Sequence, residues 1–407
     1  MEWKKHRLGE LALSIQTGPF GSQLHQSDYS ECGIPVIMPK DMSDGKIVTK
    51  DIARVSDMHV QRLKRHKVKS GDIIYSRRGD VGRCSLITER EEGWLCGTGC
   101  LKVALDKTKC VPSFIAFILQ RKDTIGWVEN HAVGATMPNL NTGILSNLPV
   151  IIPTFEGQRR IASILSAYDN LIENNNKRIR LLEQMAENLY KEWFVRFRFP
   201  GHENAEFENG LPKGWRVKRM SDFCDVTDGT HDTPKPVDDG VPLITGKCIS
   251  NGFIDYNEAY SISLEDHEKI KRRSGLSTGD ILFSNIGTVG NCCIVDYDRE
   301  FSVKNVIIFK PNDIFKTAYL YYWMMSDSMQ NVFSTQTNGA SQQFVGLTFM
   351  RRYKVLVPEQ DVLSSFGERI NPIIEQKKYL HRINQTLSRQ RDLLLPRLMS
   401  GKLEVKV

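Results

Sequence analysis

Two polar loops carry the side chains of this sequence that are best suited to contact a nucleic acid. The first loop contains Gln23 and His25, and the second contains Thr230, His231 and Lys235, with glycines in both. The amide, imidazole, hydroxyl and ammonium groups of these residues can all hydrogen-bond to base edges or phosphates. The same residues would also suit two surface turns without a ligand, so the sequence leaves both interpretations open.

A third loop combines glycine with arginine. It contains Gly79 and Gly82 and supplies Arg77, Arg78 and Arg83. Guanidinium groups on a glycine-rich backbone are suited to phosphate contact. Solvated surface charge is the alternative interpretation.

The same glycines return in the second half of the chain as Gly287 and Gly290, but the arginines do not. Asn285 stands in this second loop instead. We therefore expect one backbone shape that carries two recognition chemistries. Lys40 and Lys247 complete the set of candidate DNA-contacting residues.

The sequence lacks the common motifs of catalysis and metal binding. Gly240–Lys247 is a poor phosphate loop, because five residues instead of four separate its glycines and Cys248 replaces the required Ser or Thr. The metalloprotease, hydrolase and paired-cysteine zinc patterns are absent. The Asn/Asp-Pro-Pro-aromatic tetrapeptide expected of an amino-methyltransferase is also absent, since Asn371-Pro372 is followed by Ile373. We therefore predict no catalytic residue and no metal site in this chain.

Composition indicates an ordinary globular protein of more than one domain. The chain has 407 residues, of which 40% are hydrophobic and 25% charged. It contains no run of apolar residues long enough for a membrane span, and its first residues are charged. Nine cysteines are an odd number for a disulfide framework. We expect a cytoplasmic protein with reduced thiols.

The net charge of +7 is distributed unevenly along the chain. Residues 1–150 contain 21 basic and 16 acidic residues, whereas residues 211–355 contain 17 of each. This excess permits nucleic-acid binding without requiring it. Any contact with DNA must therefore come from local patches.

The two halves of the chain repeat each other at a spacing of about 205–212 residues. Gly71-Asp72-Ile73 returns as Gly279-Asp280-Ile281, and Val150–Pro153 returns as Val355–Pro358. Short β-branched runs predict strands near residues 36–38, 72–75, 101–105, 149–152, 243–244, 281–283 and 306–309. A helix is expected at 112–119 and at the matching 319–323. Two copies of a domain suit duplex nucleic acid, whose half-sites mirror a two-fold protein.

Each half is followed by a long helical pattern, near residues 158–197 and 362–399. The first has apolar residues at a period of 3.5, which is typical of a coiled-coil seam: Ile161, Leu165, Tyr168, Ile172, Ile179, Leu182, Ala186, Leu189 and Trp193. The second seam contains Phe366, Ile370, Ile373, Leu380, Leu387 and Leu394. Polar residues interrupt both seams, at Asn175 in the first and at Lys377, Asn384 and Arg391 in the second.

The simplest arrangement is an antiparallel pair of these two helices. Polar seam residues weaken such a pair but fix its register. Pro372 is expected to kink the second helix and Pro396 to end it.

Several stretches of the chain, in order and at the repeat spacing, resemble the specificity subunit of type I restriction–modification systems. The stretches that carry this resemblance are Gly79–Gly82, Ala135–Asn141, Pro153 with Gln158–Ala162, Leu189–Phe194, Leu211–Trp215, Asp228–Pro234, Gly287–Gly290 and Arg391–Gly401. The resemblance covers the whole chain. Gly157 departs from the pattern, because the family usually has an acidic residue there.

The resemblance implies an α+β fold with two pseudo-repeated target-recognition domains separated by two long antiparallel coiled-coil helices. The implied segments are a first recognition domain at 1–155, a spacer helix at 156–199, a linker at 200–214, a second recognition domain at 215–358 and a second spacer helix at 359–407. Each domain would read one half of a split, asymmetric DNA site, and the helices would set the gap between the halves.

The resemblance also implies partners. Two modification subunits carrying S-adenosylmethionine would dock on the helices and flip adenines for methylation, and restriction subunits would use ATP and Mg²⁺. This chain would be a non-catalytic subunit without a cofactor of its own. The alternatives are a self-sufficient DNA methyltransferase or nuclease, and a coiled-coil scaffold that does not read DNA. The family does not name the recognition residues, because they vary most among its members.

Overall fold

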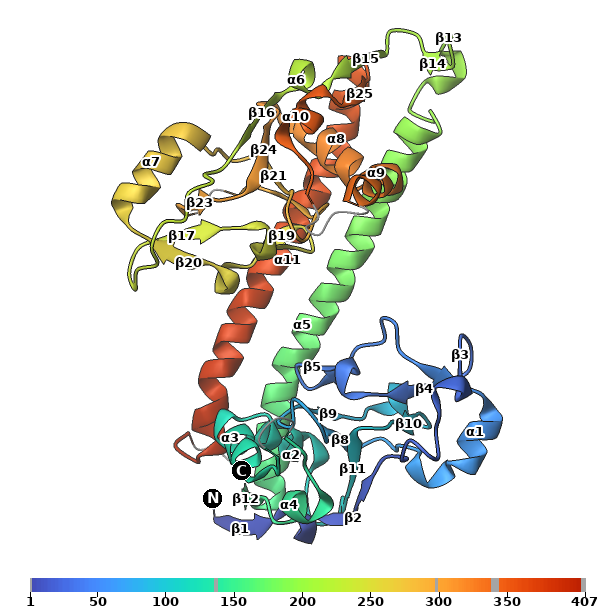
Figure 1. Cartoon of the computed structure of the whole chain (residues 1–407), viewed down its shortest axis with the longest axis vertical. Coiled ribbons are helices and arrows are strands. Elements are labelled where there is room, and N and C mark those ends of the chain that lie inside the picture. The colour runs from blue at the N-terminus through green and yellow to red at the C-terminus, as the bar shows by residue number, and fades with distance from the viewer. Residues whose placement is uncertain (1, 135–137, 297–298, 338–343, 404–407) are drawn as a thin grey trace. The chain divides into compact units, whose positions relative to one another are not determined.

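The computed structural model of the chain describes residues 2–134, 138–296, 299–337 and 344–403 (Figure 1). It divides into two compact units. Unit 1 contains Met1–Asn174 and Asn384–Val407, and unit 2 contains Asn175–Ile383. Residues 135–137 of the stretch Ala135–Asn141, and the last four residues of the segment 359–407, lie outside the described residues.

Unit 1 is built on two four-stranded sheets. The first is antiparallel, in the order β2 (Ala12–Thr17), β11 (Cys100–Leu105), β8 (Ile73–Ser76) and β9 (Cys84–Leu86). The second has the order β10 (Leu95–Cys96), β4 (Ile34–Ile37), β7 (Arg54–Val55) and β3 (Tyr29–Ser30). Two further sheets have two strands each. In one, β1 (Trp3–Arg7) pairs with β12 (Pro149–Pro153), and in the other, β5 (Met42–Ser43) pairs with β6 (Lys46–Ile47). The shorter helices are α1 (Asp57–Arg62), α2 (Pro112–Leu119), α3 (Lys122–His131) and α4 (Thr142–Ser146).

Unit 2 repeats the first sheet strand for strand and the second sheet with three strands instead of four. Its four-stranded antiparallel sheet has the order β16 (Asp225–Asp228), β24 (Val306–Lys310), β21 (Ile281–Ser284) and β22 (Cys292–Ile294). Its second sheet has the order β20 (Tyr260–Ile262), β17 (Val241–Ile244) and β23 (Ser302–Val303). The two-stranded sheets are β15 (Arg216–Arg219) with β25 (Lys354–Val357), β18 (Ile249–Ser250) with β19 (Phe253–Ile254), and β13 (Phe207–Glu208) with β14 (Leu211–Pro212). The shorter helices are α6 (Met220–Phe223), α7 (Leu264–Ser274), α8 (Ile314–Met325), α9 (Asp327–Thr337) and α10 (Leu347–Arg352).

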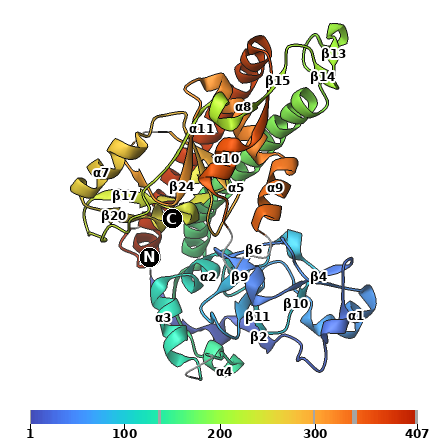
Figure 2. The ribbon, with the colours of Figure 1, turned by 45° about the horizontal axis from the view of Figure 1, so that its top comes forward.

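The duplication and the mixed α+β class are therefore confirmed. Helix α2 packs on β9 in unit 1 as α8 packs on β22 in unit 2 (Figure 2). The repeated glycines mark backbone positions that other residues rarely adopt. Gly71 and Gly279 have φ values of 91° and 92°, and Gly79 and Gly287 both have 74°. The repetition of these glycines thus reflects the repetition of two tight turns.

The two long helices are α5 (Phe155–Tyr190), which continues as a π-helical turn over Lys191–Val195, and α11 (Gln360–Met399). They lie side by side and antiparallel in each unit (Figure 1). In unit 1, Asp169 of α5 pairs with Arg391 of α11 at 2.6 Å. In unit 2, Glu183 pairs with Lys377, and the rings of Trp193 and Phe366 lie 5.7 Å apart. Every seam residue expected from the heptad pattern is buried or half-buried, and so are the polar seam positions.

Pro396 does not end α11, which continues to Met399 and also includes Pro372. A proline inside a helix removes one N–H from the helical bonding, and its ring crowds the carbonyl group four residues earlier. Ile370 and Ile374 on either side of Pro372, and Leu398 beyond Pro396, are buried in apolar cores. We attribute the continuation of the helix to this packing.

Each unit completes its core with side chains from both long helices. The core of unit 1 gathers Tyr75 and Phe114 with Leu165 of α5 and Leu398 of α11. The core of unit 2 joins Tyr319 and Phe283 to Phe194, which follows α5, and to Phe366 of α11. Within the described residues, no helix combines the length and apolar character needed to cross a bilayer.

One buried histidine gives unit 1 a specific dependence on pH. His66 is 2% exposed, and its Nε2 accepts a hydrogen bond from Nε of Arg65 at 2.9 Å. Burial, aided by the cations of Arg65 and Lys102, lowers the pKa of His66 from 6.5 to about 4. The unfolded chain therefore binds a proton at a pH where the folded unit does not.

We predict that unit 1 loses stability as the pH falls from about 6.5 to about 4, by on the order of 3 kcal/mol from this residue. The stability that His66 contributes is fully present above pH 6.5. A His66→Gln variant should lack this component, because glutamine does not titrate. Urea unfolding of both proteins at pH 7 and pH 4 measures the difference, and an equal loss in both would contradict the prediction.

Candidate nucleic-acid interface

In unit 1 the carboxyl ends of three strands meet around one turn. The turn precedes β11 and contains Gly97 and Gly99. The amide of Gly97 donates to the carbonyl of Ile37 at the end of β4, at 2.9 Å. The amide of Arg77, after β8, donates to the carbonyl of Gly99 at 2.8 Å. Gly18, after β2, donates to the carbonyl of Cys100 at 2.8 Å. Loops that are distant in sequence are thereby brought to one edge of the unit.

Glycine is required where the first loop leaves its strand. A Cβ on Gly18 would lie 2.0 Å from the carbonyl oxygen of Gly97. The equivalent residue of unit 2, Gly229, would place a Cβ 2.3 Å from the carbonyl oxygen of Val303. Both approaches are to backbone atoms, which cannot rotate away. Packing therefore requires glycine at Gly18 and at Gly229.

The six candidate residues of unit 1 follow the strands that meet at this edge. Gln23 is half-buried and its Oε1 accepts from the amide of Phe20 at 3.2 Å, whereas His25 is exposed. Lys40 is exposed and donates to the carbonyl of Asp51 at 3.4 Å.

The three arginines differ in how they are held. Arg77 donates from Nε to Asn139 at 3.3 Å, and its guanidinium lies 5.8 Å from the ring centre of Phe20. Arg83 pairs with Asp80 at 2.6 Å. Arg78 is exposed, and the structure shows no hydrogen bond or ion pair of its side chain with the described residues. Arg78 is therefore the arginine most available to a phosphate.

Unit 2 gathers the carboxyl ends of β16, β17 and β21 in the same way. The amide of Thr230 donates to the carbonyl of Val303 at 3.0 Å, and the backbone amide of Lys304 donates to the carbonyl of Ile244 at 2.9 Å. Val345 donates to the carbonyl of Asn285 at 2.9 Å. The equivalent loops of the two units thus form equivalent edges.

The five candidates of unit 2 divide into exposed and buried side chains. His231, Lys235 and Lys247 are exposed, and Lys247 lies 3.6 Å from Glu258. Thr230 is 5% exposed and accepts from the amide of Asp232 at 3.1 Å, while Asn285 is 6% exposed and donates to Val345 at 3.2 Å. The buried pair holds the shape of its loops, and the exposed residues face solvent.

Residues that the sequence did not single out join this edge. Asp228 accepts from His231 at 2.9 Å, and Asn305 contacts the other ring nitrogen of that histidine at 3.0 Å. Asn305 precedes β24 as Gly99 precedes β11, and their φ values are 50° and 80°. Comparing the two halves at these turns would have pointed to Asn305. In unit 1, Phe20 is exposed and close to Arg77.

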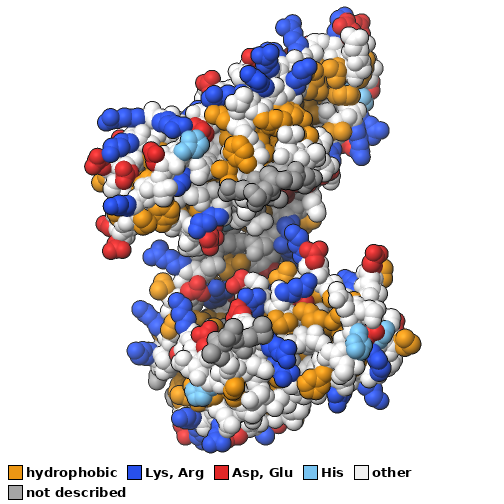
Figure 3. Space-filling view, viewed as in Figure 1, with side chains coloured by type: hydrophobic (Ala, Val, Ile, Leu, Met, Phe, Trp, Pro, Cys, Tyr) orange, Lys and Arg blue, Asp and Glu red, His pale blue; other side chains and the backbone are white. Residues whose placement is uncertain are grey.

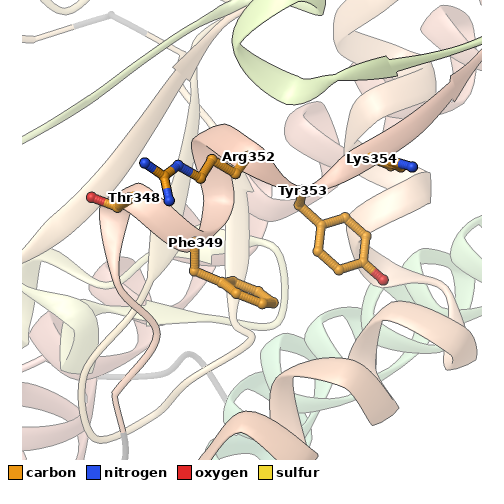
Figure 4. A pocket seen from close by; sticks show the side chains of 5 residues that line it. All are labelled: Thr348, Phe349, Arg352, Tyr353 and Lys354. Atoms are coloured by element: carbon orange, nitrogen blue, oxygen red, sulfur yellow. The ribbon is translucent and has the colours of Figure 1, made fainter.

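A pocket of unit 2 lies between α10 and β25 (Figure 4). Its volume is about 600 Å³, and its lining consists of Thr348, Phe349, Arg352, Tyr353 and Lys354. The rings of Phe349 and Tyr353 are 5.4 Å apart. Basic, acidic and apolar side chains alternate over the rest of the visible surface of each unit (Figure 3).

The described residues also contain a trio of potential metal ligands, His267, Glu268 and Glu300. The ring nitrogens of His267 already contact Ser302 at 2.9 Å and Glu300 at 2.6 Å. Lys271 contacts the same glutamate at 2.7 Å. His267, Lys271 and Glu300 thus form a hydrogen-bonded cluster that anchors α7.

The family of type I restriction modification DNA specificity domains matches residues 1–184 and 212–387 of this chain. The MjaIX specificity subunit of a type I restriction enzyme from Methanocaldococcus jannaschii is 24% identical, over 93% of this chain and 89% of that protein. The HindI specificity subunit from Haemophilus influenzae is 21% identical, over 99% of this chain and 100% of that protein.

A crystal structure shares the fold. The S subunit of a type I restriction–modification system from M. genitalium has a TM-score of 0.62 with 15% identity, covering 98% of this chain and 96% of that chain. The two matched segments coincide with the duplicated halves described above. The chain therefore belongs to the family of type I restriction modification DNA specificity domains.

Proposed function

We propose that this chain is the DNA-specificity subunit of a type I restriction–modification complex, and that each unit reads one half of a split, asymmetric site. One observation carries the proposal. Both units bring the loops after three equivalent strands to one edge, yet the side chains on these loops differ. Arg77 and Arg78 follow β8, whereas Asn285 and Ile286 follow β21. Two units with the same strand arrangement but different loop side chains are suited to reading two half-sites of different sequence.

In this proposal the recognition segments are residues 1–155 and 215–358, the linker is 200–214, and the spacer helices are 156–199 and 359–407. The pair α5 and α11 sets the gap and docks two modification subunits. Large apolar side chains remain exposed on these helices, including Leu181 and Met185 on α5 and Tyr379 and Leu393 on α11. Exposed apolar residues along a helix pair are suited to a protein partner.

The chain performs no chemistry itself. S-adenosylmethionine belongs to the modification subunits, and ATP with Mg²⁺ belongs to the restriction subunits.

A nuclease footprint of the assembled complex on genomic fragments tests the proposal: the complex should protect two short blocks of DNA separated by an unprotected gap. Uniform protection of every duplex at physiological salt would favour a scaffold, and methyl transfer by this chain alone would favour an enzyme.

We predict that Arg78→Ala weakens DNA binding equally for cognate and unrelated sequences. Loss of one phosphate contact should reduce the slope of log affinity against log salt by about 0.9. Arg90→Ala is the matched control, because Arg90 already contacts Glu91 at 2.6 Å and the carbonyl of Ile47 at 2.9 Å. Titrations from low to high salt measure the slope. Equal slopes for wild type and Arg78→Ala would refute a phosphate contact.

We also predict that lengthening both helices by one heptad widens the recognised gap. The insertions are placed between Asn174 and Asn175 in α5 and between Ile383 and Asn384 in α11, where the two units divide. Seven helical residues add about 10 Å, or about three base pairs, and preserve the seam. Methylation mapping of the variant reads the gap. A gap that stays constant would show that the helices do not set it, and insertion in α5 alone is the unmatched control.

A further inference from the structure

In unit 1 a single carboxylate joins the first polar loop to a helix. Asp28 lies at the far end of the loop that follows β2, and its side chain is 18% exposed. Its Oδ2 accepts from the amide of His25 at 2.9 Å. The same carboxylate lies 3.3 Å from Nε2 of His59 and 3.4 Å from Arg62, both on α1. Arg62 also donates to the carbonyl of Gln23 at 3.0 Å.

In unit 2 a different residue makes the same kind of connection. Asp228 ends β16, before the loop, and its side chain is 14% exposed. Its Oδ1 contacts Arg273 of α7 at 2.8 Å, and its Oδ2 contacts Nε2 of His231 at 2.9 Å. The His231 ring is held from its other nitrogen by Asn305 at 3.0 Å. One half-buried carboxylate thus links loop to helix in each unit.

The two carboxylates do not correspond in the repeat. Asp28 comes after its loop and Asp228 before it, so the duplication alone does not explain why both units have the connection. The helix at the other end of each connection also packs on a sheet of its own unit, and in unit 1 Leu24 of the loop shares the apolar cluster of Val60 with Val36 and Val55. Val60 of α1 is buried, and His267 anchors α7 through Ser302. Each helix can therefore serve as a rigid reference for its loop.

Electrostatics argue against a role of these carboxylates in raw affinity. An acid beside a surface that binds DNA repels the phosphates, and each aspartate also partly neutralises nearby cations. In unit 1 the hydrogen bond from the His25 amide, together with His59 and Arg62, lowers the pKa of Asp28, so this carboxylate stays charged at neutral pH. The hydrogen bond and ion pairs that hold this charge can instead act on the geometry of the loop. Fixing loop geometry is such an effect, because base readout requires side chains held to a fraction of an ångström.

We propose that Asp28 and Asp228 are positioning residues for sequence discrimination, each serving the half-site that its own unit reads. Asp28 holds the loop that presents Gln23 and His25, and Asp228 holds the loop that presents His231. The inference rests on the function proposed above. It adds that specificity of each half is controlled separately by one carboxylate that need not touch DNA.

The experiment uses the full chain assembled with its modification subunits and the variants Asp28→Asn and Asp228→Asn. Affinity is measured for the cognate duplex and for two duplexes, each with one half-site replaced. Each variant should lose about tenfold or more of its discrimination at one half-site and keep discrimination at the other. The two variants should affect opposite halves. Affinity for unrelated duplex should stay equal or rise, because a negative charge is removed.

Asp232→Asn and Glu31→Gln are the charge-matched controls. Both residues are exposed, and the structure shows no ion pair of either side chain with the described residues. They should raise non-specific affinity similarly and leave discrimination unchanged. Urea unfolding of each variant separates local positioning from a loss of stability.

Several outcomes would overturn the inference. Discrimination that is unchanged in both anchor variants would do so, and so would a loss at both half-sites accompanied by weaker folding. Equal losses in the charge-matched controls would show that charge, and not positioning, sets discrimination. If the wild-type complex does not discriminate at either half-site, the proposed function itself fails, which is a distinct result.

Discussion

The structure depends on the burial of one helix pair in two separate apolar cores. Leu165 of α5 and Leu398 of α11 enter the core of unit 1, while Trp193 and Phe366 enter that of unit 2. Each unit therefore needs helical residues that lie far apart in the sequence. This requirement ties the loops at the edge of each unit to the long helices, because the sheet that carries the loops packs on the same core as the helices.

Polar groups at the helix seam specify how the pair aligns. Asp169 meets Arg391 in unit 1, and Glu183 meets Lys377 in unit 2. A shift of one helix would leave such buried or half-buried charges without partners, which costs more than the pairs themselves contribute. Polar residues at the seam therefore specify the alignment of α5 with α11 at some cost in stability. A fixed alignment is what the proposed function requires of the two helices.

The sequence predicted the features that depend on local pattern. Paired glycines such as Gly79 and Gly287 identified the repeated turns, and the heptads identified both long helices. It could not predict the contacts made by Asp28, because His59 and Arg62 are brought to it only by folding. It also could not show that Asn285 is buried, or that packing carries α11 past Pro396. Tertiary packing overrode local preference at these positions.

The central claim is that each unit reads its own half-site independently, while both units are joined to the same pair of helices, α5 and α11. Exchange of residues 1–155 for the corresponding domain of another family member, with α5 and α11 retained, tests it most directly. Mapping of methylated adenines in cells that carry the hybrid complex gives the recognised site. The account predicts that one half of the site changes while the other half and the gap remain. A site that changes in both halves, or in neither, would contradict it.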